Sequence, residues 1–291
     1  MRRGSQCACG LLAMVAIAQL AFAQAPEFRL PESVEAGSAF SVPTSGSGAA
    51  VFYIVGPGGA FRRNVRLGET VSFAADDISH AGHYLATLAA GSFVESKPFD
   101  IMPSRQPAAI SFLARPSRVA TNQSDGISGV VYVFDAFHNL VLQPKDVSFA
   151  LAESAGSPQT RTAATRNGVA WIRMNSATKA GAAQFEARVG EIHEHRVIQQ
   201  VAADPCRVKI NARPSGSRIL LETEPVRDCS GNPVPDGTIV SFSETYGSRQ
   251  ATVDVPLKRG IAKTEMPAYR GAVISAAIGV VMGNEIRWGS Q

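Results

Sequence analysis

The chain has 291 residues, 45% of them hydrophobic and 18% charged, which indicates packed cores and excludes a disordered chain. Its formal net charge is +4, and loss of Arg2 and Arg3 with an N-terminal leader would leave 26 basic and 24 acidic side chains. Because this balance is nearly neutral and lysines and arginines are not clustered, we expect neither nucleic acid nor an anionic membrane surface as a partner.

The N-terminus has the pattern of a signal peptide. Arg2 and Arg3 precede a run at 11–22 that is apolar except for one glutamine, and this run is shorter than the roughly 20 residues that a membrane span needs. Ala23 completes an A-x-A cleavage pattern, so we expect residues 1–23 to be removed and the mature chain to begin at Gln24. The protein is therefore expected to be extracytoplasmic (periplasmic, at the cell surface or secreted), with no membrane insertion after cleavage.

The region from 26 to 103 has the pattern of a β-sandwich. Residues 51–55 (VFYIV) are typical of a strand and end at the turn signal 56–59 (GPGG). Tyr84 begins another strand pattern, which follows the run 77–83 (DISHAGH). This arrangement is similar to the tyrosine corner of immunoglobulin-like sandwiches, where a tyrosine hydroxyl bonds to upstream backbone. We predict a divergent immunoglobulin-like sandwich here.

Strand patterns continue through the middle of the chain. Residues 130–134 (VVYVF) are apolar on both faces and predict a central strand. In 147–151 (VSFAL) and 184–189 (QFEARV), large apolar side chains alternate with small or charged ones, as one buried and one solvated sheet face require. We find no convincing amphipathic helix in the mature chain, so the predicted fold class is all-β.

The middle and last thirds of the chain are related copies. Residues 135–141 (DAFHNLV) align with 228–234 (DCSGNPV), and residues 147–149 (VSF) align with 240–242 (VSF), both at an offset of 93. A period of this length suits a sandwich of about seven strands and is too long for the unit of a solenoid. We therefore expect tandem immunoglobulin-like β-sandwich domains.

Proline-containing linkers occur where this period predicts domain boundaries, at 102–107 and 203–205. The predicted domains are accordingly 26–103, 108–203 and 206–291. Short linkers that contain proline favour a semi-rigid connection between domains.

One motif of the last copy is moderately specific for a type of β-sandwich repeat. Residues 228–242 (DCSGNPVPDGTIVSF) are followed by 259–264 (RGIAKT), so that a Gly-Asn-Pro turn joins two strands and a Gly-hydrophobic-Ala run opens another. Residues 108–291 thereby resemble the bacterial immunoglobulin-like repeats of the intimin and invasin group. The resemblance implies stalks or adhesive surfaces outside the inner membrane, and it does not extend to host-cell adhesion.

Two cysteines remain after cleavage, because Cys7 and Cys9 lie in the leader. If Cys206 opens a strand and the turn at 214–217 reverses the chain, the next strand returns Cys229 beside Cys206. In an oxidising compartment a disulfide between them would contribute about 3 kcal/mol through the unfolded state. We predict this disulfide, since free thiols in redox or metal chemistry would lack a C-x-x-C motif.

Two groups of histidines raise a metal hypothesis that we do not adopt. His193 and His195 would share one strand face with Glu191, and His80 and His83 follow two aspartates in a loop. Zinc needs three or four convergent ligands, and neither group provides them by itself. We expect exposed histidines at both places.

Signatures of common enzymes are missing from the chain, including the G-x-S-x-G, H-E-x-x-H and G-x-x-x-x-G-K motifs. We predict a protein that is not an enzyme and that has no catalytic residue, metal or cofactor. A glycosidase pair of carboxylates has no fixed sequence spacing and stays open.

Exposed aromatic residues would favour carbohydrate recognition. Trp171 lies between Ala170 and Ile172 in a strand pattern, and we expect it to pack in the core rather than to point outward; Trp288 is ambiguous. The predicted function is a structural or interaction module whose partner is a protein or polysaccharide of the cell envelope. A carbohydrate-binding or carbohydrate-processing protein and a subunit of a cell-envelope assembly remain as alternatives.

Overall fold

The computed structural model describes residues 25–153, 157–267 and 269–289. The predicted signal peptide, 1–23, lies outside the described residues. All regular secondary structure in the described residues is β-strand, which confirms the all-β prediction. Within the same ranges, no helix has the length and apolar character needed to cross a bilayer.

The chain divides into two compact units, Met1–Met102 and Pro103–Gln291. In the first unit the described strands form two sheets, with the orders β1-β3-β6 and β2-β8-β7-β4-β5. Their bounds are β1 (Glu27–Phe28), β2 (Ser33–Glu35), β3 (Phe40–Ser45), β4 (Ala49–Gly56), β5 (Gly59–Arg66), β6 (Thr70–Phe73), β7 (Gly82–Ala90) and β8 (Phe93–Met102).

Aromatic rings hold the two sheets of the first unit together. Phe52 of β4 packs against Phe28 of β1 and Phe73 of β6, with ring centroids 5.4 and 6.2 Å apart. Phe40 of β3 and Phe99 of β8 lie 6.2 Å apart, again across the two sheets. A sandwich core of this kind forms because the inward positions of both sheets are large and apolar.

Tyr84 lies near the beginning of β7 and is buried. Its hydroxyl donates a hydrogen bond to the carbonyl of His80 at 2.8 Å and accepts one from the backbone N–H of Gly58 at 3.2 Å. A buried tyrosine that bonds to backbone a few residues upstream is the mark of a tyrosine corner. The immunoglobulin-like interpretation of this region is therefore confirmed as a fold.

The second unit begins with two further sheets, with the orders β14-β11-β9 and β10-β16-β15-β12-β13. The predicted central strand at 130–134 is part of β11, which lies between two partners. The bounds are β9 (Ala109–Arg115), β10 (Arg118–Ala120), β11 (Ile127–Phe134), β12 (Asp146–Glu153), β13 (Gln159–Ala164), β14 (Val169–Met174), β15 (Gly181–Val189) and β16 (Ile192–Val201).

The same unit continues with the sheets β17-β18-β21 and β20-β19-β22-β23, and β24 also pairs with β22. The bounds are β17 (Ile210–Ser215), β18 (Arg218–Thr223), β19 (Ile239–Tyr246), β20 (Arg249–Pro256), β21 (Lys263–Pro267), β22 (Val273–Ile278), β23 (Val281–Met282) and β24 (Ile286–Arg287).

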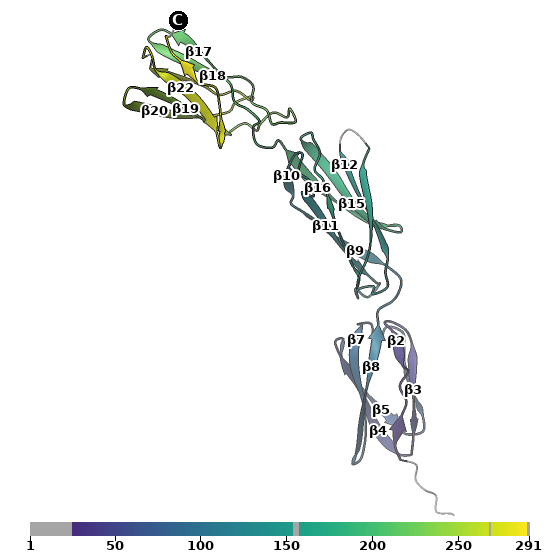
Figure 1. Cartoon of the computed structure of the whole chain (residues 1–291). Coiled ribbons are helices and arrows are strands. Elements are labelled where there is room, and N and C mark those ends of the chain that lie inside the picture. Colours follow the sequence, from purple (N-terminus) through teal and green to yellow (C-terminus); the bar gives the residue numbers. More distant parts are fainter. Residues whose placement is uncertain (1–24, 154–156, 268, 290–291) are drawn as a thin grey trace, which may run out of the picture. The chain divides into compact units, whose positions relative to one another are not determined.

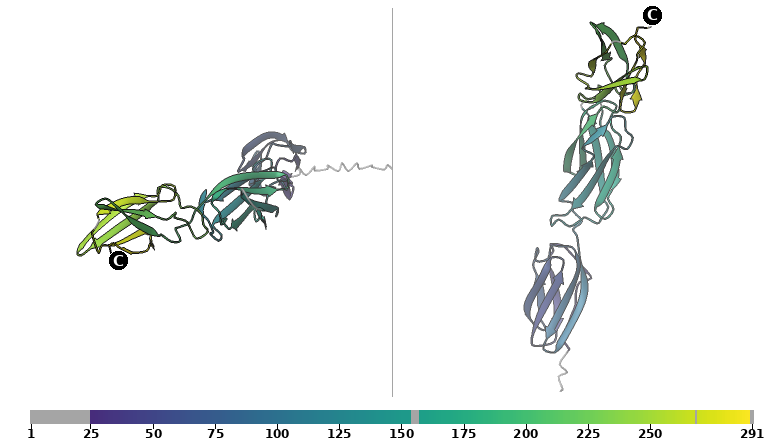
Figure 2. Two further views of the ribbon diagram at one scale, coloured as in Figure 1. Left: turned by 90° about the horizontal axis from the view of Figure 1, so that it is seen from above. Right: turned by 90° about the vertical axis from the view of Figure 1, so that its left-hand side faces the viewer.

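The two parts of the second unit repeat one topology. Each has a three-stranded sheet and a larger sheet whose strands follow the same order along the chain (Figure 1). Strand β12 begins at Asp146 and β19 begins at Ile239, at the offset of 93 that the sequence predicts. Figure 2 shows the strands of both parts in two further views. The internal duplication is thus visible in the fold.

The core lies on the strand faces that the alternating sequence patterns predict. Val147, Phe149 and Leu151 of β12 are buried, as are Phe185 and Ala187 of β15. Their side chains belong to one continuous apolar cluster between the two sheets of residues 109–201. A second cluster fills the sandwich of residues 208–287.

One core prediction is wrong. The side chain of Trp171 is 66% exposed, whereas Ala170, Ile172 and Met174 of the same strand are buried. Strand β14 has one covered face, because its sheet packs on a partner sheet from one side only. Since neighbouring residues of a strand point to opposite faces, Trp171 points outward. Trp288 is half-buried and packs against the core of the last sandwich.

Candidate functional site

The repeated segments 135–139 and 228–232 build the same loop in both sandwiches of the second unit. In the first copy, Asp135 accepts hydrogen bonds from the backbone N–H groups of Phe137 and Asn139, both at 2.9 Å, and from the Asn139 amide at 3.0 Å. His138 adopts a positive φ of 63° in this turn. The aspartate is 1% exposed, so the turn is organised around a buried carboxylate.

The second copy repeats this geometry bond for bond. Asp228 accepts from the N–H groups of Ser230 and Asn232 at 2.9 and 2.8 Å, and from the Asn232 amide at 2.9 Å. Gly231 replaces histidine at the position of positive φ, here 83°. We call both segments the Asp–Asn loop.

Each Asp–Asn loop also binds the linker that leads into its own sandwich. Oδ2 of Asp135 accepts a hydrogen bond from the N–H of Ser104 at 2.9 Å, and Oδ2 of Asp228 accepts one from the N–H of Ala203 at 3.1 Å. Because the acceptor is a charged oxygen and the donor is backbone, these bonds depend little on the linker's side chains. The aspartate therefore anchors the approaching chain.

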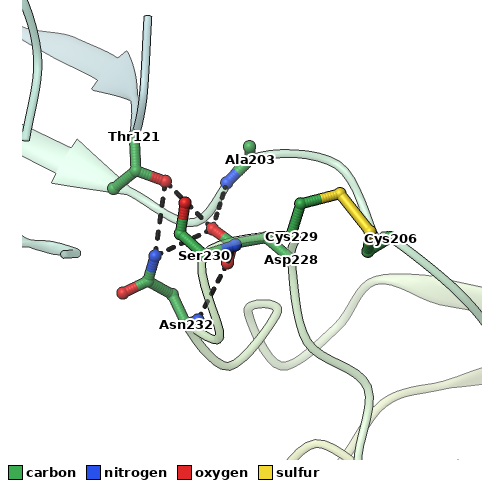
Figure 3. The surroundings of a disulfide bond; sticks show 7 residues. All are labelled: Thr121, Ala203, Cys206, Asp228, Cys229, Ser230 and Asn232. Carbon is green, nitrogen blue, oxygen red and sulfur yellow. Dashed lines mark hydrogen bonds between the residues drawn. A yellow bond between two sulfur atoms is a disulfide. The ribbon is translucent and has the colours of Figure 1, made fainter. Parts of the chain in front are cut away.

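The second Asp–Asn loop further bonds to the preceding sandwich. The Thr121 hydroxyl donates to Oδ2 of Asp228 at 2.9 Å, and the Asn232 amide donates to the carbonyl of Thr178 at 2.8 Å (Figure 3 shows the first of these). The N–H of Ala180 donates to Oδ1 of Asn232 at 2.9 Å. We call Thr121, Thr178, Ala180, Ala203, Asp228 and Asn232 the joint.

Hydrogen bonds determine the pKa values of the buried aspartates in the two Asp–Asn loops. Burial by itself raises the pKa of Asp228, but donors from Asn232, Thr121 and Ala203 outweigh it and lower this pKa to about 2. The pKa of Asp135 is also lowered: burial opposes the shift, and hydrogen bonds from Asn139, Ser104 and Phe137 prevail. Both carboxyls are thus ionised at neutral pH and serve as acceptors.

A disulfide lies beside the joint. Cys206 and Cys229 are joined with a Cα–Cα distance of 4.7 Å, and Cys229 directly follows Asp228 (Figure 3). The predicted chain reversal at 214–217 is present as the hairpin β17–β18. Cys206 precedes this hairpin instead of opening it, and its N–H bonds to the carbonyl of Arg227 at 3.1 Å. The bridge therefore connects the linker to the second Asp–Asn loop.

The structure places the histidines of the two groups at exposed positions on strands and in a loop. His193 and His195 are exposed on β16, and the Nδ1 atom of His193 lies 3.3 Å from the carbonyl oxygen of Glu191. His83 pairs with Asp100 across β7 and β8. The described residues hold no group of three or more histidine, cysteine, aspartate or glutamate side chains that could bind a metal ion.

Sequence reasoning found the repeated segment but assigned it only the role of a turn. The signal for more was present, because Asp and Asn recur at the same two places in 135–139 and 228–232 while the three residues between them all differ. The sequence does not reveal which residue the second Asp–Asn loop contacts in the preceding sandwich, because that residue, Thr121, lies 107 residues before Asp228.

The fold defines a class, that of tandem immunoglobulin-like sandwich proteins. No protein-family model matches the chain, and no curated protein matches it. Solved structures do: FdeC, an Escherichia coli adhesin, is 12% identical, with a TM-score of 0.61 over 91% of this chain and 98% of that chain.

Two further structures have lower scores. Invasin, a bacterial integrin-binding protein, is 11% identical over 91% of this chain and 59% of its own, with a TM-score of 0.48. The FN1–FN3 domains of chicken CNTN1 are 12% identical over 90% of this chain and 96% of theirs, with a TM-score of 0.38. At these identities the likeness to FdeC establishes the fold, and the resemblance to bacterial immunoglobulin-like repeats is confirmed at that level.

Proposed function

We propose that this chain is a non-enzymatic, extracytoplasmic structural and interaction protein, at the cell surface or in the periplasm. Its domains would be 26–103, 108–203 and 206–291, and its partner a protein or polysaccharide of the cell envelope. The observation on which this proposal depends is the joint. A buried network of hydrogen bonds between consecutive sandwiches, centred on the Asp228 carboxylate, serves to hold two surfaces in a constant relation, which a binding or spacing role requires.

Three other observations support the proposal. The cysteine pair suits an oxidising compartment outside the cytoplasm. The apolar leader at 11–22 suits export. FdeC, which has a similar fold, is an adhesin.

The location and the partner are tested together in the native organism. Cells that produce the full chain with a C-terminal affinity tag are fractionated, and the N-terminus of the recovered protein is determined by mass spectrometry. We expect a mature protein that begins at Gln24 in the envelope fraction or the medium. Recovery of an unprocessed chain from the cytoplasm alone would refute the proposal.

Cross-linking of intact cells before purification identifies the partner. We expect a defined envelope protein or polysaccharide to copurify, and a chain that copurifies with nothing after cross-linking would contradict an interaction role. Copurification of a multiprotein complex in constant proportions would instead assign the chain to an envelope assembly.

A further inference from the structure

A carboxyl group occupies a core position in the last sandwich. Along β19, Val240 and Phe242 are buried and face the core, and Glu244 continues this face with 3% exposure. At the offset of 93, the corresponding residue of the middle sandwich is Leu151, which is 1% exposed. One copy of the repeat therefore places a glutamate where the other places a leucine.

The Glu244 carboxyl is not satisfied within the described structure. Its Oε1 atom is buried and has no hydrogen-bond partner. Burial raises the pKa of Glu244, because it penalises the charged carboxylate relative to the neutral acid, which can both donate and accept a hydrogen bond. A buried polar atom without a partner destabilises the folded state, and sandwich packing gives no reason to retain one here.

Glu244 is one of the residues that line an open pocket of about 320 Å³. The pocket lies at the turn between β19 and β20 and beside the end of β21. We call it the tyrosine pocket; its lining is Glu244, Tyr246, Arg249, Gln250, Ala251, Pro267 and Tyr269.

Two tyrosines at the pocket give it an aromatic wall. The rings of Tyr246 and Tyr269 are stacked, with centroids 5.2 Å apart and planes inclined by 14°. They are 45% and 41% exposed, although large aromatic side chains are usually buried. Their mutual stacking orders both rings, so that a ligand would meet a preformed surface.

The combination of groups selects among ligand chemistries. A cationic ligand would suit the tyrosines and Glu244, but Arg249 lines the same pocket and would repel it. An anionic ligand would pair with Arg249, but the faces of the two tyrosine rings carry partial negative charge and would repel it. A neutral polyol with an apolar face fits all of them, because its hydroxyls can donate and accept hydrogen bonds while its C–H face packs on an aromatic ring.

We propose that the tyrosine pocket binds a neutral sugar unit of a polysaccharide, with Tyr246 and Tyr269 as the platform and Glu244 as the inner hydrogen-bonding group. Arg249 and Gln250 would bond to further hydroxyls at the rim. This inference rests on the proposed interaction role and names one class of partner for it.

The test begins with a glycan array probed with the purified, processed full chain, followed by calorimetric titration of the best oligosaccharide. We expect selective binding to neutral glycans. Tyr246→Ala and Tyr269→Ala should each weaken this binding at least tenfold. Trp171→Ala is the matched control, because Trp171 is also an exposed aromatic residue and lies outside the pocket, and its loss should leave the dissociation constant unchanged.

Two substitutions of Glu244 separate binding from folding. Glu244→Leu introduces the residue of the sister copy, and it should abolish binding while it raises the melting temperature. Glu244→Gln keeps a donor and an acceptor without a charge, and it should retain binding within a few-fold. A loss of binding in the glutamine variant would show that a charged carboxylate is needed, and this would overturn the proposal of a neutral sugar.

Other outcomes would also overturn the inference. These are an array without selective binding, glycan binding that survives both tyrosine substitutions, and tight binding of an oligolysine probe at the pocket. The double variant Tyr246→Ala/Tyr269→Ala is then carried through the cross-linking experiment. If it still captures an envelope partner, the interaction role stands and only the sugar site has failed.

Discussion

Asp228 and Glu244 are buried carboxyl groups in one sandwich, and their pKa values are shifted in opposite directions. Asp228 accepts several hydrogen bonds that favour its charged form, whereas burial is the cause of the shift at Glu244. The difference shows that burial alone does not decide the charge of a carboxyl; the number of donors around it does.

These shifts predict the pH dependence of stability. Since the folded pKa of Asp228 is depressed to about 2, its contribution is complete above the unfolded pKa of about 4 and is lost as pH falls toward 2. Since the pKa of Glu244 is raised, the folded state binds more protons than the unfolded state, and stability declines as pH rises above the unfolded value of about 4.3. Urea unfolding from pH 2 to 8 measures both effects.

The variants Asp228→Asn and Glu244→Leu test whether Asp228 causes the loss of stability at low pH and Glu244 the decline at higher pH. The first should flatten the acid limb and lower the free energy of unfolding by about 1–3 kcal/mol near neutral pH. The second should flatten the decline at higher pH. An unchanged acid limb in Asp228→Asn would show that other carboxyls dominate it.

Gly56 predicts a steric effect at the tyrosine corner. A Cβ atom at this position would lie 2.2 Å from Cδ1 of Tyr84, so Gly56→Ala must displace the ring and break its bonds to Gly58 and His80. We expect a loss of about 1–3 kcal/mol in thermal or urea unfolding. Gly181→Ala is the control, because nothing lies within 4 Å of its added Cβ, and it should be neutral.

At the scale of elements, the sister strands β12 and β19 show how far duplication constrains the chain. Their lengths and inward positions agree, and their partner strands follow the same order. They differ at Leu151 and Glu244, near the strand end, where a single exchange converts core into pocket lining. In this pair of strands the duplication preserves the order of the sheet, and the exchange lies near the strand end.

The disulfide belongs to the same scale, because it joins the linker to the second Asp–Asn loop. The cysteines are 23 residues apart, and closure of a loop of this size should stabilise the sandwich by about 3 kcal/mol through the unfolded state. Unfolding of the oxidised protein is compared with that of the Cys206→Ser/Cys229→Ser variant. Equal midpoints for the two proteins would contradict a stabilising bridge, and mass spectrometry after alkylation checks that the bridge has formed.

For the whole molecule, the joint predicts a narrow range of arrangements between the two sandwiches of the second unit. Spin labels at the exposed positions Thr162→Cys and Lys263→Cys report this range by double electron–electron resonance. Asn232→Ala removes the bonds to Thr178 and Ala180 and should broaden the distance distribution. Asn139→Ala disturbs the equivalent loop of the middle sandwich and should leave the distance distribution narrow. Equal distributions in the parent protein and in both variants would contradict a rigid joint.

The sequence alone determined the all-β class, the duplicated sandwich and the strand positions of the core. These follow from local information: the alternation in 147–151 and 184–189, the offset of 93, and turn residues such as Gly231. Alternation depends only on the pleat of a strand, so it can be interpreted before any sheet is assembled. The pairing of Cys206 with Cys229 was also predicted, from the reversal between them.

Only the tertiary structure decided which face of a strand is covered and what lies across a boundary between sandwiches. Trp171 is exposed because no second layer covers its face of β14, and Asp228 is part of a joint because Thr121 of another sandwich reaches it. Glu244 is a polar residue that its type would place at the surface, yet the fold buries it. Each of these outcomes depends on contacts between residues far apart in the chain, which local patterns do not specify.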